Sequence, residues 1–255
     1  MRILLSNDDG IFSPGMEILA SALRGLGDLT IVAPDAERSA VGHAITLSDP
    51  IKTRELFRNG ELFGYAASGT PADCVKLAVC ALMDQPPDLV VSGINLGPNA
   101  GISIIYSGTV SAATEGTILG IPSMAVSLAT FVHPQWETAG RATRILAEFL
   151  IAQPLPVGVL LNVNIPNRVW GDIRGFRSTR MGASRFIETF DRRKDPRGND
   201  YYWMDGFIEA IPPYDETDLS ALDAGFISLT PISFDLTNTA ALEQLRSRIP
   251  QWISG

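Results

Sequence analysis

Five short runs rich in Leu, Ile and Val occupy the first two thirds of the chain, and they constrain its fold more than any other feature. None of these runs alternates polar with apolar residues, so each predicts a strand that is covered on both faces, as in a parallel sheet. The runs are RILLS (2–6), LTIVA (29–33), DLVVSG (88–93), PSMAVSL (122–128) and GVLLNVNI (158–165).

The segments between these runs have the periodicity of apolar residues that is typical of helices. Apolar residues share one helical face over 16–26, 75–82 and 136–150. Before the second of these, Thr70 and Asp73 have the spacing of a capping box. Strands that alternate with helices in this way indicate an α/β fold with a doubly wound, mainly parallel sheet.

Residues 45–66 depart from this alternation. The segment has β-type composition with Asn-Gly at 59–60, a common hairpin turn, so it predicts a β-hairpin excursion.

The chain changes character again after about residue 170. The stretch 190–203 is charged and aromatic and lacks periodicity, so we expect an arm or an irregular subdomain there. A strand near 226–234 and a final helix from about 239 to 249 should follow. The expected organisation is a core over 1–170 and a C-terminal subdomain over 171–255.

The charge of the chain restricts its partners. Acidic residues outnumber basic ones by 28 to 20, which gives a net charge of −8 and argues against binding a nucleic-acid polymer. No apolar stretch reaches the length of a membrane span, and Met1 and Arg2 lead directly into a strand-like segment without a signal peptide. We therefore expect a cytoplasmic protein without a membrane partner.

Polar residues follow three of the predicted strands. Asp8 and Asp9 come after the first, Ser39 after the second and Asn95 after the third. Ligands of an open parallel sheet bind beyond the carboxyl ends of the strands, and an all-oxygen set suits Mg²⁺ or Mn²⁺. We predict one divalent cation per subunit, held by these four residues. The alternative function of the aspartate pair is a helix-capping turn.

A glycine-rich loop, SGINLGPNAG (92–101), precedes YSGTV (106–110), which opens a predicted helix. Backbone N–H groups of such a loop and of a helix N-terminus can bind a phosphate. The alternative is an ordinary loop with a Ser/Thr helix cap. The candidate phosphate-binding residues are Asn95, Gly97, Asn99, Ser107, Gly108 and Thr109.

His43 lies four residues beyond Ser39 and could orient phosphate or protonate a leaving group. A structural or solvated histidine is the more common case. The basic run at 192–197 is likewise interpreted as a solvated loop.

Several motifs, in order, resemble the survival protein SurE family of metal-dependent 5′/3′-nucleotidases. The motifs are ILLSNDDG, SGTPADCV (68–75), SGINLGPNAG, YSGTVSAATEG (106–116) and DPRGNDYYW (195–203). The resemblance implies a Rossmann-like three-layer α/β/α core and a divalent cation at the positions of Asp8, Asp9, Ser39 and Asn95. It also implies hydrolysis of nucleoside monophosphates, exopolyphosphatase activity in some members, and homodimers or homotetramers that exchange C-terminal segments.

The expected reaction is metal-assisted phosphomonoester hydrolysis, with Asp8, Asp9 and Asn95 as the catalytic residues. Either water or Asp9 could attack the phosphorus, and the sequence favours water because Asp9 already serves as a ligand. Two other classes stay open. A phosphoacceptor receiver module would need an aspartate where Asn95 stands, and a non-catalytic nucleotide sensor would use the same pocket without turnover. The preferred base, the choice between the 5′ and 3′ positions, the physiological metal and the number of subunits are open as well.

Overall fold

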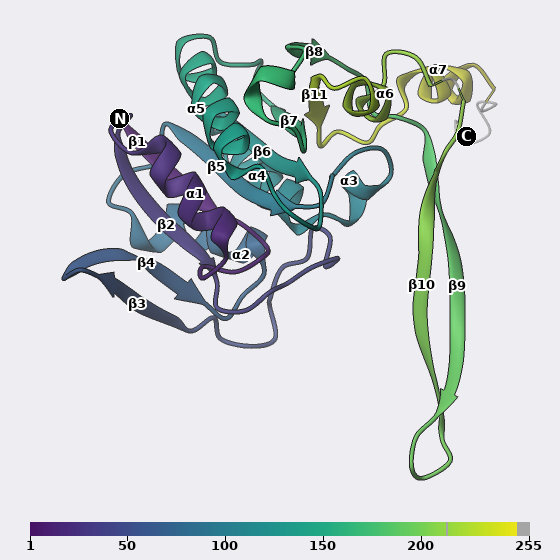
Figure 1. Ribbon diagram of the computed structural model, residues 1–255, viewed down its shortest axis with the longest axis horizontal. Helices are drawn as coiled ribbons and strands as arrows, with labels where there is room; N and C mark the ends of the chain where they lie inside the picture. The colour runs from purple at the N-terminus through teal and green to yellow at the C-terminus, as the bar shows by residue number, and fades with distance from the viewer. Residues whose placement is uncertain (213, 249–255) are drawn as a thin grey trace, which may run out of the picture.

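The computed structural model describes residues 1–212 and 214–248 and contains a nine-stranded central sheet in that part of the chain. The strand order is β3-β4-β2-β1-β5-β6-β7-β11-β8 (Figure 1). Strands β4, β2, β1, β5, β6 and β7 run parallel, while β3 and β11 run antiparallel to their neighbours β4 and β7. The bounds are β1 Arg2–Ser6, β2 Asp28–Pro34, β3 Thr53–Arg58, β4 Glu61–Ala67, β5 Leu89–Leu96, β6 Ser123–Ala129, β7 Val159–Pro166, β8 Phe176–Ser178 and β11 Ile227–Ser233.

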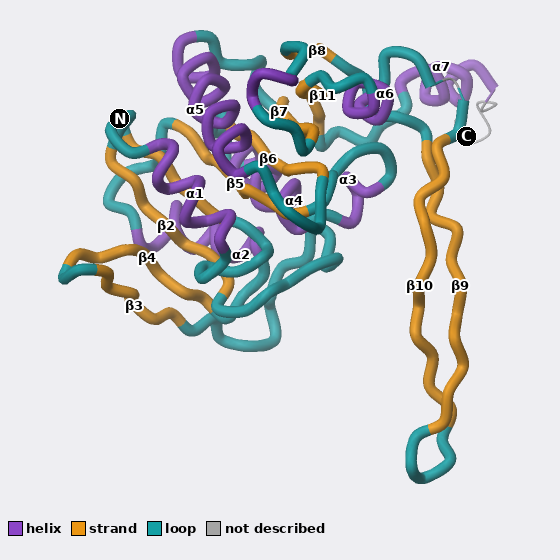
Figure 2. The backbone as a smooth tube through the Cα atoms, in the orientation of Figure 1, coloured by secondary structure: helices purple, strands orange, loops and turns teal. Residues whose placement is uncertain are grey.

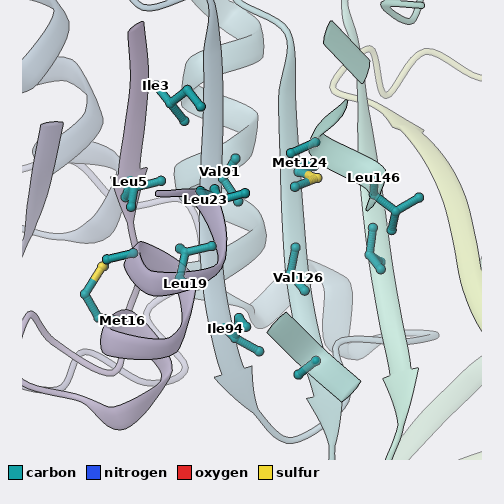
Figure 3. Close-up of a cluster of buried hydrophobic side chains, with 14 of the residues drawn as sticks. Ile3, Leu5, Met16, Leu19, Leu23, Val91, Ile94, Met124, Val126 and Leu146 are labelled. Atoms are coloured by element: carbon teal, nitrogen blue, oxygen red, sulfur yellow. The ribbon is translucent and has the colours of Figure 1, made fainter. Parts of the chain in front are cut away.

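Helices cover both faces of this sheet. Along β1, Ile3 and Leu5 join the core beneath α1 and α5 (Figure 3), whereas Leu4 belongs to the core beneath α2 and α4. This two-sided burial explains the unbroken apolar runs and confirms the predicted α/β architecture. The helices are α1 Pro14–Leu23, α2 Pro71–Leu77, α3 Ser103–Tyr106, α4 Gly108–Ile118, α5 Trp136–Ala152, α6 Asp218–Asp223 and α7 Thr239–Arg248, with a π-helical turn at Ala78–Leu82 and a 3₁₀ turn at Trp170–Asp172.

The predicted hairpin forms from β3 and β4. Asn59 and Gly60 connect the two strands with φ angles of +51° and +83°, the left-handed conformation that a tight hairpin turn requires. β4 also pairs with β2, so the hairpin is the edge of the central sheet and not a separate excursion.

Of the two structures expected around 190–203, an arm or an irregular subdomain, the protein has an arm, which is a regular antiparallel hairpin. β9 (Ser184–Lys194) and β10 (Asp200–Ala210) pair along their whole length and extend away from the sheet (Figures 1 and 2). Most residues of both strands are exposed. A strand without a buried face has no alternation of polar and apolar residues, which is why periodicity did not reveal it.

The C-terminal segment completes the central sheet. β11 confirms the strand expected near 226–234, and α7 agrees with the expected final helix up to Arg248, since residue 249 lies outside the described residues. β8 and β11 both follow residue 170 and both belong to the central sheet. The division into 1–170 and 171–255 stays a prediction, and the sheet extends across it. None of the described helices combines the length and the apolarity that a membrane crossing requires.

Candidate active site

The turn after β1 leaves Asp8 and Asp9 free of any capping role. Asn7 closes the turn, because its Nδ2 donates to the Gly10 carbonyl at 3.0 Å and to Ser13 Oγ at 2.8 Å. Ser13 is the N-cap of α1, and its hydroxyl accepts a hydrogen bond from the first helical turn. Helix capping was the alternative function considered for the aspartate pair, and for α1 that function is performed by Ser13.

Asp8 lies against the N-terminal turn of α4. Its side chain is buried, and Thr109 donates hydrogen bonds to it from its hydroxyl and its backbone N–H. A Cβ on Gly108 would lie 2.7 Å from the Cβ of Asp8, so only glycine permits this close approach. Burial raises the pKa of Asp8, and the hydrogen bonds from Thr109 oppose that rise. The structure thus brings Asp8 together with the helix N-terminus predicted to bind phosphate.

Asp9 places a second carboxylate beside the first. Burial raises the pKa of Asp9 to about 6, and the charge of Asp8 contributes to this rise. A hydrogen bond from the Leu96 N–H opposes it. Among the described residues, no Lys or Arg forms an ion pair with either aspartate. The pair therefore carries negative charge that no described basic side chain balances.

A hollow of about 360 Å³ opens beside Asp9. Glu37 lines it, and its negative charge contributes to the raised pKa of both aspartates. Glu37 was not among the predicted site residues. Its only signal in the sequence is its place two residues before Ser39.

Ser39 is exposed, and its hydroxyl donates to Glu37 Oε1 at 2.6 Å. The loop that carries it lies next to the aspartates, because the Arg38 N–H donates to the Asp8 carbonyl at 2.8 Å. Metal ligation by Ser39 stays a prediction, and it would require the hydroxyl to leave Glu37.

Asn95 is the next-to-last residue of β5, and its side chain is turned toward the loop that follows. Its Nδ2 donates to the carbonyls of Gly97 and Leu96, at 2.8 and 3.2 Å, while no described residue donates to its Oδ1. The amide is thus held with its oxygen available as a ligand.

Asp8, Asp9 and Asn95 carry carboxylate and amide oxygens, which are hard donors of the kind that Mg²⁺ or Mn²⁺ prefers. In the described chain, no three Asp, Glu, His or Cys side chains are grouped so that they could hold a metal ion. A cation at this site would therefore need amide, hydroxyl or water oxygens in addition to the two carboxylates.

The glycine-rich loop is anchored from inside the protein. The Asn99 N–H donates to Asn164 Oδ1 at 2.8 Å, and its Nδ2 donates to Ser127 Oγ at 2.9 Å. Its carbonyl accepts hydrogen bonds from Asn162 and Asn164. Asn99 therefore anchors the loop to the protein interior through its backbone N–H and its Nδ2, and phosphate binding by Asn99 stays a prediction.

The other predicted phosphate-binding residues lie along this loop and at the start of α4. Gly97 has a φ of +103°, a conformation that favours glycine. Ser107 is the N-cap of α4, and its hydroxyl accepts a hydrogen bond from the Val110 N–H at 3.1 Å.

The remaining candidates have structural contacts. His43 Nε2 lies 3.0 Å from Glu115 Oε2, and Lys76 pairs with the other oxygen of this buried carboxylate. In the basic run, Arg192 and Lys194 pair with Asp200 on the opposite strand of the arm. These contacts agree with the structural interpretation of His43. Arg192, Arg193 and Lys194 of the basic run lie on β9, and only Arg197 lies in the expected loop, between β9 and β10.

Comparison with known proteins identifies close relatives. The family model described as survival protein SurE matches residues 3–188. A protein of Syntrophobacter fumaroxidans named 5′-nucleotidase SurE is 49% identical over 245 residues, covering 96% of this chain and 98% of the relative. A protein of Syntrophus aciditrophicus with the same name is 50% identical over 248 residues, covering 97% and 93% of the two chains.

A solved structure has the same fold. The crystal structure of the SurE protein from Aquifex aeolicus superposes with a TM-score of 0.84 at 39% identity, covering 98% of this chain and all of that one.

Proposed function

This chain belongs to the survival protein SurE family, and we propose that its 5′-nucleotidase activity resides at the Asp8–Asp9 pair and requires one bound divalent cation. The enzyme hydrolyses nucleoside 5′-monophosphates to nucleoside and phosphate. The main support for this site is that Asp8 and Asp9 are adjacent carboxylates, largely removed from water, whose negative charge no described basic side chain balances. Keeping both ionised costs free energy unless a cation binds them.

Asp8, Asp9 and Asn95 Oδ1 would hold the cation, with Ser39 as the fourth predicted ligand. A bound Mg²⁺ or Mn²⁺ supplies Lewis-acid polarisation of a phosphoryl oxygen and lowers the pKa of a bound water. The hydrogen bonds from Thr109 orient Asp8 for ligation.

The N-terminus of α4 binds the substrate phosphate in this proposal. Backbone N–H groups in the first turn of a helix have no intrahelical partner and attract anions. Gly108 leaves room for close approach, and it lies against Asp8, so a phosphate bound there would neighbour the cation ligands. These donors would stabilise the negative charge on the equatorial oxygens of the reacting phosphoryl group.

Water is the nucleophile in this proposal, because Asp9 is occupied as a ligand. The position that a receiver module needs for its acceptor aspartate is held by Asn95 at the end of β5, and an amide cannot form an acyl phosphate.

Phosphate release from AMP and GMP by the purified chain in Mn²⁺ tests this function directly. We expect multiple turnovers, with release proportional to enzyme concentration. Nucleotide binding without release would instead identify a non-catalytic sensor, and would contradict the proposal.

We propose further that the chain forms a homodimer or homotetramer through its C-terminal segment. The arm is a two-stranded hairpin, which is marginally stable alone in water, and it exposes many apolar side chains. α7 buries none of its described residues. Exchange of these elements with another copy would cover these surfaces. The exposed apolar residues of the arm include Phe190, Tyr201, Tyr202, Trp203, Met204, Phe207 and Ile208.

Light scattering at micromolar concentration should give two or four times the chain mass of 27.5 kDa. Replacing Trp203 and Phe207 together with serine should lower that mass, because both side chains are more than half exposed in one chain. A wild-type mass of one chain would contradict this assembly. Phe57 provides a control, because it is also exposed but lies on β3, at the edge of the central sheet farthest from β8. Its replacement should leave the mass unchanged.

A further inference from the structure

We propose that Asp218, on α6, is a positioning residue of the active site that holds the glycine-rich loop in its phosphate-binding conformation. This inference rests on the proposed nucleotidase function and on the phosphate-binding role predicted for the glycine-rich loop 92–101, and it names a residue of the C-terminal segment on which that role depends. Asp218 is fully buried, although it lies more than a hundred residues along the chain from the loop.

The Asp218 carboxylate joins three separate segments. Its Oδ2 accepts a hydrogen bond from the Gly101 N–H at 2.8 Å. Its Oδ1 accepts from the Gly182 N–H at 2.9 Å and from the Leu219 N–H at 2.8 Å. Within residues 1–212 and 214–248, no Lys or Arg pairs with it. Its charge is therefore compensated by backbone N–H groups alone, one of them from the loop.

A second contact fixes the same part of the loop. The Ile102 N–H donates to Ser184 Oγ at 2.8 Å, and Ser184 is the first residue of β9. At Gly101, φ is +54°, and a Cβ would lie 2.3 Å from Ser184 Oγ. The loop is thus packed directly on the base of the arm and on α6.

The opposite side of the loop is held by β7 through Asn99, as described above. The segment that these two anchors hold leads from Asn95, near the end of β5, to Ser107, the N-cap of α4. Release of Gly101 would weaken the anchor on the side of α6, where only the contact between Ile102 and Ser184 would remain. The loop N–H groups that are predicted to bind phosphate would then be held less firmly, while Asp8 and Asp9 would keep their positions.

The substitution Asp218→Asn can remove the loop contact selectively. An amide group offers only one oxygen, and two N–H groups face Oδ1 whereas one faces Oδ2. The amide oxygen should therefore take the Oδ1 position and its NH₂ group should face the Gly101 N–H, donor against donor. The neighbouring substitution Thr217→Ala is a matched control. It removes the N-cap of α6 and leaves the contact between Asp218 and Gly101.

We expect Asp218→Asn to raise the KM for AMP and the inhibition constant of inorganic phosphate by about tenfold or more, the factor that follows from losing one charged hydrogen bond. Because the phosphate is held in both the ground state and the transition state, kcat should change much less. The dissociation constant of Mn²⁺ should stay within about twofold, since Asp8 and Asp9 are untouched. Hydrogen exchange of the peptide covering 97–106 should be faster than in wild type.

Thr217→Ala should leave KM, the phosphate constant and the exchange of this peptide unchanged. Equal changes in both variants, or an unchanged KM in Asp218→Asn, would overturn the positioning role. If the wild-type protein releases no phosphate from any nucleoside monophosphate, the proposed function fails instead. The exchange comparison then still decides whether Asp218 holds the loop, and unchanged exchange would overturn the inference by itself.

Discussion

Asp9→Asn should lower kcat/KM for AMP by at least about a thousandfold, because Lewis-acid stabilisation of several kcal/mol depends on this ligand and each 1.36 kcal/mol is a factor of ten. The amide keeps the size of the side chain and removes one of two adjacent negative charges. The fold should therefore survive, and thermal unfolding should occur at or above the wild-type temperature when no metal is added. Steady-state kinetics in Mn²⁺ and a thermal melt measure the two effects.

Asp35→Asn is the matched control, because Asp35 lines the same hollow as Asp9. Its carboxylate is exposed and pairs with Arg38 at 3.8 Å, a surface contact worth about 0–1 kcal/mol. Activity of this variant should stay within about fivefold of wild type. Near-normal kcat/KM in Asp9→Asn, or equal losses in both variants, would exclude Asp9 as a ligand.

Exhaustive chelation with EDTA should reduce phosphate release from AMP by at least about a hundredfold, and added Mn²⁺ or Mg²⁺ should restore it. The reason is that no described Lys or Arg is paired with Asp8 or Asp9 to take the place of the cation. Full activity after chelation would refute the proposed mechanism.

A binding measurement separates the cation from the chemistry. At a free Mn²⁺ concentration of about 100 times its dissociation constant, mass action stabilises the folded protein by about 2.7 kcal/mol and raises Tm by about 5 to 10 °C. Asp9→Asn should lose most of this shift. An equal shift in both proteins would mean that the stabilising cation binds elsewhere.

The sequence predicted those strands whose burial produces a recognisable pattern of apolar residues. The strands β1, β2, β5, β6 and β7 lie between two helical layers, so each is a continuous apolar run. The hairpin of β3 and β4 was predicted from two residues, Asn59 and Gly60, because few others tolerate the left-handed conformation of its turn.

Candidate site residues could be proposed from the sequence only where they lie at the end of a strand. Asp8 and Asp9 come after β1, and Asn95 is the next-to-last residue of β5, so the edge of the parallel sheet made all three candidates for a ligand site. Ser39 follows β2 by a loop, and the hydrogen bond of its hydroxyl to Glu37 depends on how that loop folds. Asp218 could not be inferred locally at all, since its partner Gly101 lies in a distant segment.

The position of β11 has a consequence for the synthesis of the protein. β7 pairs with β6 on one side and with β11 on the other, and β11 is translated roughly 70 residues after β7. At about 5 to 20 residues per second, the ribosome needs roughly 4 to 14 s for this interval. During that time the apolar strand VLLNVNIP is an open edge of a partly assembled sheet, a template for pairing with other chains. We therefore expect a nascent chain that stalls between β7 and β11 to be more prone to aggregation than the complete chain.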